Sequence, residues 1–557
     1  MTTHHQSPLK TLRTTAGRRR LVKCLAVGVL AFTTPNLLAA CSSDSTSTEA
    51  GSADVQSLTW AIGNGLSDLD SVKNFQAGNW THTVNTYEAP MRLTDDGEIE
   101  AALAESWDQP DPTTIVLTLR QGVKFQDGTD LTADDVVFSL ARNLDPEQGT
   151  GAGATYYGSV ESIEATGDNE VSVRLKSPDP LFPYVLASPA ALVTSQAYFE
   201  EAGDKFGTSE FPGMGTGPYR FTSFNPSTGY TLEAHDDYWG GAPEVQKFGM
   251  KFIEDTQARL FAFQSGELDG TNDVPTNNLE PWDQAGHIQY LNDYFLFAWS
   301  FQTDASPWDD VNVRKAIAYA TDAEGLNQAA TAGQGSVARA MVQPELFANL
   351  ADQDQVDQLY ADLPSYEFDM DKAAEALAAS SHADGFTADV TVPNTFPELR
   401  TIALNTAENL KALNVTLNVK EVPEEQIYPF WLNLPPDHAN AQNNGLIARL
   451  FPAGTLPDPA DPLATSLQGD QINPGGQNSA AYVDPQVDDL FEEQRSSTDP
   501  QARFDALSQI LTKAQSDLPY YPIFFGGNSE AVRDGLGYSN LNPYTFMKPW
   551  IPTIVSE

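Results

Sequence analysis

The chain has 557 residues, with 76 acidic and 31 basic side chains and a formal charge of −45. Its hydrophobic content of 41% and its charged content of 19% are typical of globular proteins, and the length predicts several domains with sizeable cores. Excess negative charge repels phosphate backbones, so we expect no nucleic-acid binding, and two cysteines cannot form a disulfide framework or a thiolate metal cluster.

The first 40 residues predict an export signal that is removed. Arg18, Arg19 and Arg20 precede an apolar stretch at 21–32 that is too short to span a bilayer comfortably. The pattern is compatible with general secretory export and with the twin-arginine route, which it also resembles. After this segment, residues 41–557 carry 25 basic and 76 acidic side chains, a net charge of −51.

Cys41 is the predicted lipid attachment point. Leu38–Cys41 resembles the bacterial lipobox, in which cleavage precedes a cysteine that carries a diacylglycerol; the alternative is an ordinary free thiol. The polar residues that follow are typical of a flexible tether, which we assign to 41–55. Two acyl chains anchor a protein stably, so we expect a folded body outside the cytoplasmic membrane.

Strand and helix patterns alternate along the rest of the chain. β-Branched residues alternating with a period of two predict strands at 58–62, 114–119, 171–175 and 415–419. Helix starts are indicated by capping residues at Thr132, Asp255, Asp484 and Asp499, and the last two acids each precede a proline. Gly266 is a predicted helix stop. This mixture indicates an α/β body with more than one lobe.

Sequence motifs for catalysis are missing from the chain. It has no Gly-x-Ser-x-Gly elbow, no His-Glu-x-x-His pair, no Walker loop and no dinucleotide-binding glycine pattern, and its histidines are scattered. We therefore expect no enzyme activity, no cofactor and no metal site. A catalytic triad whose members are dispersed in the sequence stays an open alternative. Aromatic runs at 294–301, 428–431 and 519–525 predict core strands or the walls of a ligand pocket.

A series of motifs resembles the family 5 solute-binding proteins, which are the peptide- and nickel-binding receptors of ABC importers. The matching segments follow in family order: 103–107, 119–128, 131–139, 215–221, 237–243, 263–269, 310–322 and 482–490. Together they extend over nearly all of residues 57–530.

The resemblance implies a two-lobed Venus-flytrap fold with one additional domain, three domains in all. We assign lobe I to 56–85, 213–300 and 526–557, the extra domain to 86–212, and lobe II to 301–525. The lobes would be joined by hinge crossings near 299–302 and 524–527, and closure around a ligand would create the form that docks on the permease.

The resemblance also implies a ligand anchor in lobe II. Peptide-binding members use an aspartate of an Asp-Tyr-Pro-Asp-Pro-like stretch to pair with the peptide amine, whereas the corresponding position here is Thr455. Asp458 or Asp461 could replace that acid, and Arg449 could meet a ligand carboxylate or form an ion pair with a nearby acid. The full set of ligand-binding candidates is Trp80, Trp299, Phe301, Phe430, Trp431, Arg449, Phe451, Asp458 and Asp461.

The sequence therefore predicts a monomeric, lipid-anchored receptor on the outer face of the cytoplasmic membrane. Its expected partners are a peptide or another small solute and the permease and ATPase subunits of an ABC importer. A metal chelate, a sugar or another small molecule is the alternative ligand, although the scattered histidines disfavour direct nickel binding. An exported hydrolase is the alternative function.

Overall fold

The computed structural model describes residues 55–63, 65–66, 68–73, 77–145, 156–394, 396–423, 426–427, 431, 446–452, 456–472 and 476–557. The predicted export signal, Cys41 and nearly all of the tether lie outside these residues. In the described part, no helix combines the length and the apolar character that a bilayer span requires.

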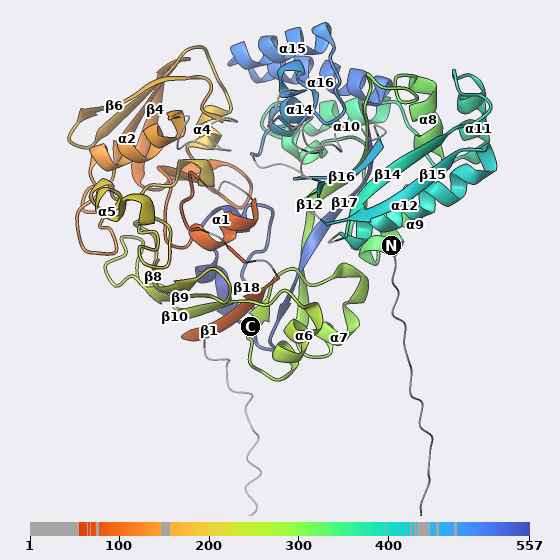
Figure 1. Ribbon diagram of the computed structural model, residues 1–557. Coiled ribbons are helices and arrows are strands. Elements are labelled where there is room, and N and C mark those ends of the chain that lie inside the picture. The colour runs from red at the N-terminus through yellow and green to blue at the C-terminus, as the bar shows by residue number, and fades with distance from the viewer. Residues whose placement is uncertain are drawn as a thin grey trace, which may run out of the picture. The chain divides into compact units, whose positions relative to one another are not determined.

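The largest sheet contains eleven strands and has helices packed along it (Figure 1). In spatial order they are β15 (Thr416–Val422), β14 (Thr387–Pro393), β16 (Leu446–Pro452), β12 (His287–Phe301), β17 (Tyr520–Val532), β11 (Gly270–Thr271), β1 (Ser57–Ile62), β10 (Lys247–Phe252), β9 (Gly229–Ala234) and β8 (Tyr219–Asn225), with β13 (Ser336–Val337) also pairing with β17. Pairing is parallel for β1 with β10 and β11, and for β14 with β15 and β16. The sheet is therefore mixed.

Two long strands, β12 and β17, connect the two halves of this sheet. Residues 295–301 of β12 lie between β16 and β17, whereas residues 287–291 pair with β17 alone among the described strands. Ala531 and Val532 of β17 pair with β12 on one side and with β11 on the other. The register shifts between Leu291 and Phe295. We propose that the chain crosses between lobes at this irregularity, several residues before the predicted crossing at 299–302.

The aromatic run on β12 is largely apolar because both faces of the strand are buried. Phe297, Trp299 and Phe301 contribute to one core cluster, whereas Leu296 and Ala298 contribute to another. The buried Ser300 is the polar exception, and its hydroxyl is hydrogen-bonded to that of Ser479 at 2.9 Å. Successive side chains of a strand point to opposite faces, so apolar residues at consecutive positions are expected of a strand between two cores.

Helices cover both faces of this half-sheet. α8 (Val311–Tyr319), α9 (Ala323–Thr331) and α12 (Pro397–Leu410) contribute to the cluster of Trp299, which we call core cluster 2. The opposite face carries core cluster 3, to which these helices contribute: α10 (Gln353–Asp362), α14 (Ala460–Leu467), α15 (Pro485–Ser496) and α16 (Pro500–Asp517). α11 (Met370–Ala378) packs beside α8.

A separate four-stranded antiparallel sheet lies within the predicted extra domain, in the order β4 (Ala104–Asp111), β5 (Thr114–Leu119), β7 (Glu170–Leu175) and β6 (Val160–Gly167). The helices of the same domain are α2 (Ala133–Ala141), α4 (Phe182–Val185) and α5 (Gln196–Ala202) (Figure 1). The extra domain also contains the hairpin of β2 (Met91–Leu93) with β3 (Ile99–Ala101). Predicted lobe I contains the short helices α1 (Ala77–Thr83), α6 (Thr256–Gln264) and α7 (Glu280–Asp283) and the antiparallel pair of β18 (Leu536–Tyr538) with β19 (Ile554–Ser556).

The extra domain and predicted lobe I share one core, core cluster 1, and buried charges connect them. Glu88 is 5% exposed and accepts hydrogen bonds from Thr216 Oγ1 at 2.8 Å, Tyr238 Oη at 2.9 Å and Trp239 Nε1 at 2.9 Å. A second connection is the buried ion pair of Asp70 with Arg142, at 2.6 Å. We call these two domains together the first body.

The predicted helix caps are confirmed. Thr132 forms a capping box with Asp135, and Asp255, Asp484 and Asp499 each accept hydrogen bonds from backbone N–H groups in the first turn of the helix they precede. Gly266 has φ of 76°, the left-handed conformation expected after α6. These predictions succeed because caps depend on a few neighbouring residues.

Candidate functional site

A buried ion pair fixes the loop that precedes α14. Asp458 Oδ2 lies 2.9 Å from Arg503 Nη1, and Arg503 Nη2 donates to Asp458 Oδ1 at 2.9 Å. The two side chains are only 3% and 7% exposed. Arg503 also donates to Gln494 Oε1 at 3.2 Å, so α15 and α16 both hold the base of this loop. A bidentate arginine–carboxylate contact fixes the relative orientation of the two side chains and also pairs their charges.

The second acid of the loop, Asp461, closes a short turn. Its Oδ2 accepts a hydrogen bond from the Leu456 backbone N–H at 3.0 Å, while Asp458 Oδ1 accepts from the Ala460 backbone N–H at 2.9 Å. Asp461 Oδ1 also accepts a hydrogen bond of 3.3 Å from Tyr156 Oη of the extra domain. The same carboxylate therefore braces the loop and joins it to the first body.

The tip of this loop contacts the first body through apolar atoms. Leu456 has no exposed surface and belongs to core cluster 1. Pro457 packs against Gly97 in the turn between β2 and β3: a Cβ added at Gly97 would lie 2.9 Å from Pro457 Cβ. Gly97 has φ of 79°, so this close approach and the backbone conformation both require glycine.

A cavity of about 200 Å³ lies beside the loop, between the extra domain and residues of predicted lobe II. The extra domain contributes Pro112 and Tyr184, and the other wall includes Leu350, Asp458 and Arg503. Asn349 Nδ2 donates to Tyr184 Oη at 3.2 Å across this interface. Clefts at domain interfaces with apolar walls and a few fixed polar groups are typical ligand sites.

The aromatic candidates separate between two cores. Trp299, Phe301 and Trp431 belong to core cluster 2, and the Trp299 indole N–H donates to Thr321 Oγ1 at 3.1 Å. Trp80 belongs to core cluster 1. Trp299 and Phe301 have no exposed surface, so they pack core cluster 2, and a role as pocket walls stays a prediction.

Two further candidates are only partly described. Phe451 lies on β16 opposite Leu296, but its side chain is outside the described residues. Phe430 and Thr455 are also outside them.

Arg449 lies on β16 opposite Ala298, on the face of the sheet that carries core cluster 3. Trp299 is on the other face. The Arg449 guanidinium is 2% exposed, donates from Nη1 to the Gln477 backbone oxygen at 2.7 Å, and has its pKa lowered to about 10 by burial. Its predicted contact with a ligand carboxylate stays a prediction.

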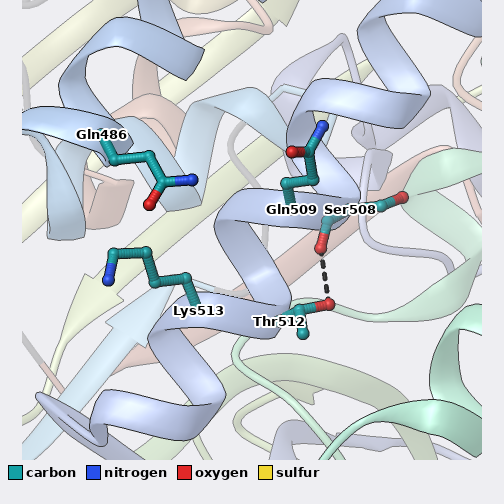
Figure 2. A pocket seen from close by; sticks show the side chains of 5 residues that line it. All are labelled: Gln486, Ser508, Gln509, Thr512 and Lys513. Atoms are coloured by element: carbon teal, nitrogen blue, oxygen red, sulfur yellow. Dashed lines mark hydrogen bonds between the residues drawn. The ribbon is translucent and has the colours of Figure 1, made fainter.

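A second cavity, of about 310 Å³, lies between α15 and α16 (Figure 2). Gln486 extends from one helix toward the side of the groove that carries Gln509 and Lys513 on the other. Lys513 lies 3.0 Å from Asp484 and 3.3 Å from Asp517, and these contacts raise its pKa. Because its ammonium is already paired and the groove involves a single lobe, this cavity is the weaker ligand candidate.

Sequence reasoning missed the residues that complete the interface, namely Arg503, Tyr156 and Leu456. The partner of Asp458 is 45 positions away and that of Asp461 is 305 positions away, so no local pattern connects them. Within the described residues, no group of three or more His, Cys, Asp and Glu side chains is arranged to hold a metal ion.

The family model for bacterial extracellular solute-binding proteins, family 5 (middle), matches residues 98–471. The chain belongs to this family. The family consists of solute-binding receptors, and the predicted two-lobed α/β fold with an additional domain is confirmed by solved structures of its members.

Curated relatives match most of the chain. Heme-binding protein A of Haemophilus influenzae is 26% identical over 473 residues, covering 80% of this chain and 81% of that protein. The oligopeptide-binding protein OppA of Bacillus subtilis is 24% identical over 480 residues, covering 79% and 82%. Among solved structures, AppA of Bacillus subtilis in complex with a nonapeptide has a TM-score of 0.74 at 21% identity, covering 90% of this chain and 99% of that chain.

Proposed function

We propose that this protein is the lipid-anchored receptor of an ABC importer and that it captures a peptide between its two lobes. The observation that carries the proposal is the pair of continuous strands, β12 and β17, that connects two half-sheets in a family 5 chain. Relatives that are named oligopeptide- and dipeptide-binding proteins support peptide as the ligand class.

Closure supplies the mechanism. A solute that contacts both lobes stabilises the closed form through its higher affinity for that form, and the closed surface then docks on the permease. The protein itself performs no reaction, acts as a monomer, and delivers its solute to the permease that the ATPase subunits drive. We retain the other domain boundaries predicted from the sequence and move the boundary between lobe I and lobe II from 300–301 to the irregularity at Leu291–Phe295.

Of the two acids in this loop, Asp461 is better suited than Asp458 to anchor a peptide amine. Asp458 is engaged by the Arg503 guanidinium through both oxygens. Asp461 accepts hydrogen bonds from two neutral donors, the Leu456 N–H and the Tyr156 hydroxyl. An ammonium group replaces a neutral hydroxyl at a carboxylate more readily than it replaces a paired guanidinium, so we propose Asp461 as the anchor.

A non-peptide solute is the second candidate. One relative is named a heme-binding protein, and solved structures with this fold include one in complex with agropinic acid, so the fold accommodates ligands of other chemistry. The aromatic candidates would serve such a ligand as apolar walls.

Anchoring depends on Cys41, which we propose to carry the lipid that holds the receptor at the outer face of the cytoplasmic membrane. The export-signal pattern and the small residues before Cys41 support this assignment.

Native purification of the full chain followed by mass spectrometry of the released small molecules tests the ligand class. Peptides recovered at close to one equivalent are expected. Recovery of a non-peptide solute alone would refute the peptide assignment, and turnover of a peptide or an ester by the purified protein would refute the receptor assignment in favour of a hydrolase.

A further inference from the structure

We propose that residues 456–461 form a closure latch, in which an apolar tip on lobe II docks into the first body and holds the closed form together. This inference rests on the proposed function, because it assumes that the lobes open and close. It adds an apolar tip, Leu456 and Pro457, that contributes to the energy of closure separately from the proposed ligand anchor Asp461.

The base of the latch is rigid. Asp458 is fixed to α16 by the two terminal guanidinium nitrogens of Arg503. The turn is closed by hydrogen bonds from the Ala460 backbone N–H to Asp458 and from the Leu456 backbone N–H to Asp461. A tip held in this way loses little conformational freedom when it docks, so most of its contact energy remains available to stabilise the closed form.

The tip crosses to the other body. Among the buried residues described in core cluster 1, Leu456 is the one that comes from 301–525, and it has no exposed surface. Pro457 lies against Gly97, beside Tyr544 of the first body. Opening the lobes would return Leu456 to water, and burial of one leucine side chain is enough to shift an open–closed ratio by tenfold or more.

The remaining contacts of this interface suit reversible docking. Tyr156 donates a hydrogen bond to Asp461, and Asn349 donates to Tyr184, so each contact includes a neutral partner. Within the first body, by contrast, the buried Asp70–Arg142 pair and the Glu88 network hold the extra domain to lobe I. The interface beside the latch also encloses the 200 Å³ cavity, which the two surfaces leave unfilled when they meet.

The latch has a consequence for affinity. If only the closed form binds the solute tightly, the apparent dissociation constant is the intrinsic one divided by the closed fraction. Weakening the tip therefore lowers the closed fraction in the absence of solute and weakens apparent binding by the same factor, without changing a ligand contact.

The test measures the open–closed ratio of the full chain directly, in detergent. Spin labels are attached to non-canonical amino acids at Glu164 in the extra domain and Glu492 in lobe II, two exposed positions, so the natural cysteines are not used. Distances are measured by electron–electron double resonance after dialysis has removed bound solute, which mass spectrometry verifies. The variants are Leu456→Ser and Tyr156→Phe, and Leu404→Ser on the exposed face of α12 is the matched control.

We expect the wild-type chain to show a population with the short inter-label distance of the closed form. Leu456→Ser should lower the ratio of closed to open populations at least tenfold, and Tyr156→Phe about threefold. Leu404→Ser should leave this ratio unchanged. Wild-type distance distributions in both latch variants would overturn the proposal, as would a wild-type chain that is entirely open without solute. If Leu456→Ser does not fold, Tyr156→Phe decides alone, because it removes one hydroxyl. The identity of the solute does not enter the measurement, so a failed latch and a failed ligand assignment are distinguishable.

Discussion

Replacing Arg503 with methionine removes one partner of the buried pair and leaves the Asp458 carboxylate behind. That side chain is 3% exposed and would keep the Ala460 backbone N–H as a hydrogen-bond donor. Breaking a buried ion pair from one side costs about 3–5 kcal/mol, because the remaining charge is neither hydrated nor compensated. For a domain the size of lobe II, about 2–4 °C per kcal/mol corresponds to a fall of roughly 6–20 °C in its melting temperature.

Differential scanning calorimetry of the full chain measures this fall, and Arg400→Met is the matched control. Arg400 pairs with Glu421 at 2.6 Å, but the two side chains are 51% and 47% exposed. Exposed pairs contribute about 0–1 kcal/mol, so this control should unfold close to the wild type. Adding Asp458→Asn to Arg503→Met should recover part of the loss, since a buried amide carries no net charge.

Equal melting temperatures of Arg503→Met and Arg400→Met would refute this prediction. A lower melting temperature after Asp458→Asn is added to Arg503→Met would also refute it, because the loss would then come from packing of the arginine side chain and not from an uncompensated carboxylate.

Three further changes test other parts of the chain. Glu530 is fully buried and burial raises its pKa well above 4.5, with Asp273 adding to the rise and Arg259 opposing it, so the folded state keeps a proton that the unfolded state loses. The free energy of unfolding therefore falls by about 1.4 kcal/mol per pH unit as the pH rises from about 4.5 to the pKa of Glu530 in the folded state. Urea unfolding at several pH values should show this decline in the wild type and not in Glu530→Gln. The same pH dependence in both proteins would contradict the prediction. Glu88→Ala leaves one buried donor (Thr216) and two half-buried donors (Tyr238 and Trp239) without their acceptor. It should cost about 3 kcal/mol by urea unfolding, whereas a loss under 1 kcal/mol would argue against the network. Cys41→Ser should move the protein from the membrane fraction to the medium or leave it uncleaved, and unchanged membrane attachment of a processed chain would exclude the lipid anchor.

Local features of the fold were predictable because they depend on neighbouring residues. The Thr132 capping box and the Asp-Pro helix starts at 484 and 499 are determined within one turn of helix. The strand predicted at 415–419 is present as β15, although it starts one residue later and extends to Val422 because pairing with β14 continues. Boundaries shift in this way where a neighbouring strand supplies hydrogen bonds that the sequence does not reveal.

The candidate site was less predictable because its contacts are between distant residues. Alternation along 294–301 is invisible in the sequence, since apolar residues occupy both faces of β12, and only the structure separates Trp299 from Ala298. Arg449 was predicted to meet a ligand carboxylate or a nearby acid, yet its environment depends on the pairing of β16 with β12. The sequence indicates which groups can pair with an arginine, but topology decides which core it enters.

In residues 451–461, different side chains serve ligand binding and the docking of the two lobes. Its departure from the family pattern at Thr455 concerns the amine anchor. Leu456, by contrast, contributes to the core of the first body, and Asp458 holds the base of the segment to Arg503 of lobe II. A rigid base and an apolar tip make the energy of closure adjustable by substitutions at positions 456 and 457, while the carboxylates beside them keep their hydrogen bonds. Because apparent affinity depends on the closed fraction as well as on ligand contacts, changes at the tip should scale the affinity for all solutes by one common factor and leave the order of preference among them unchanged.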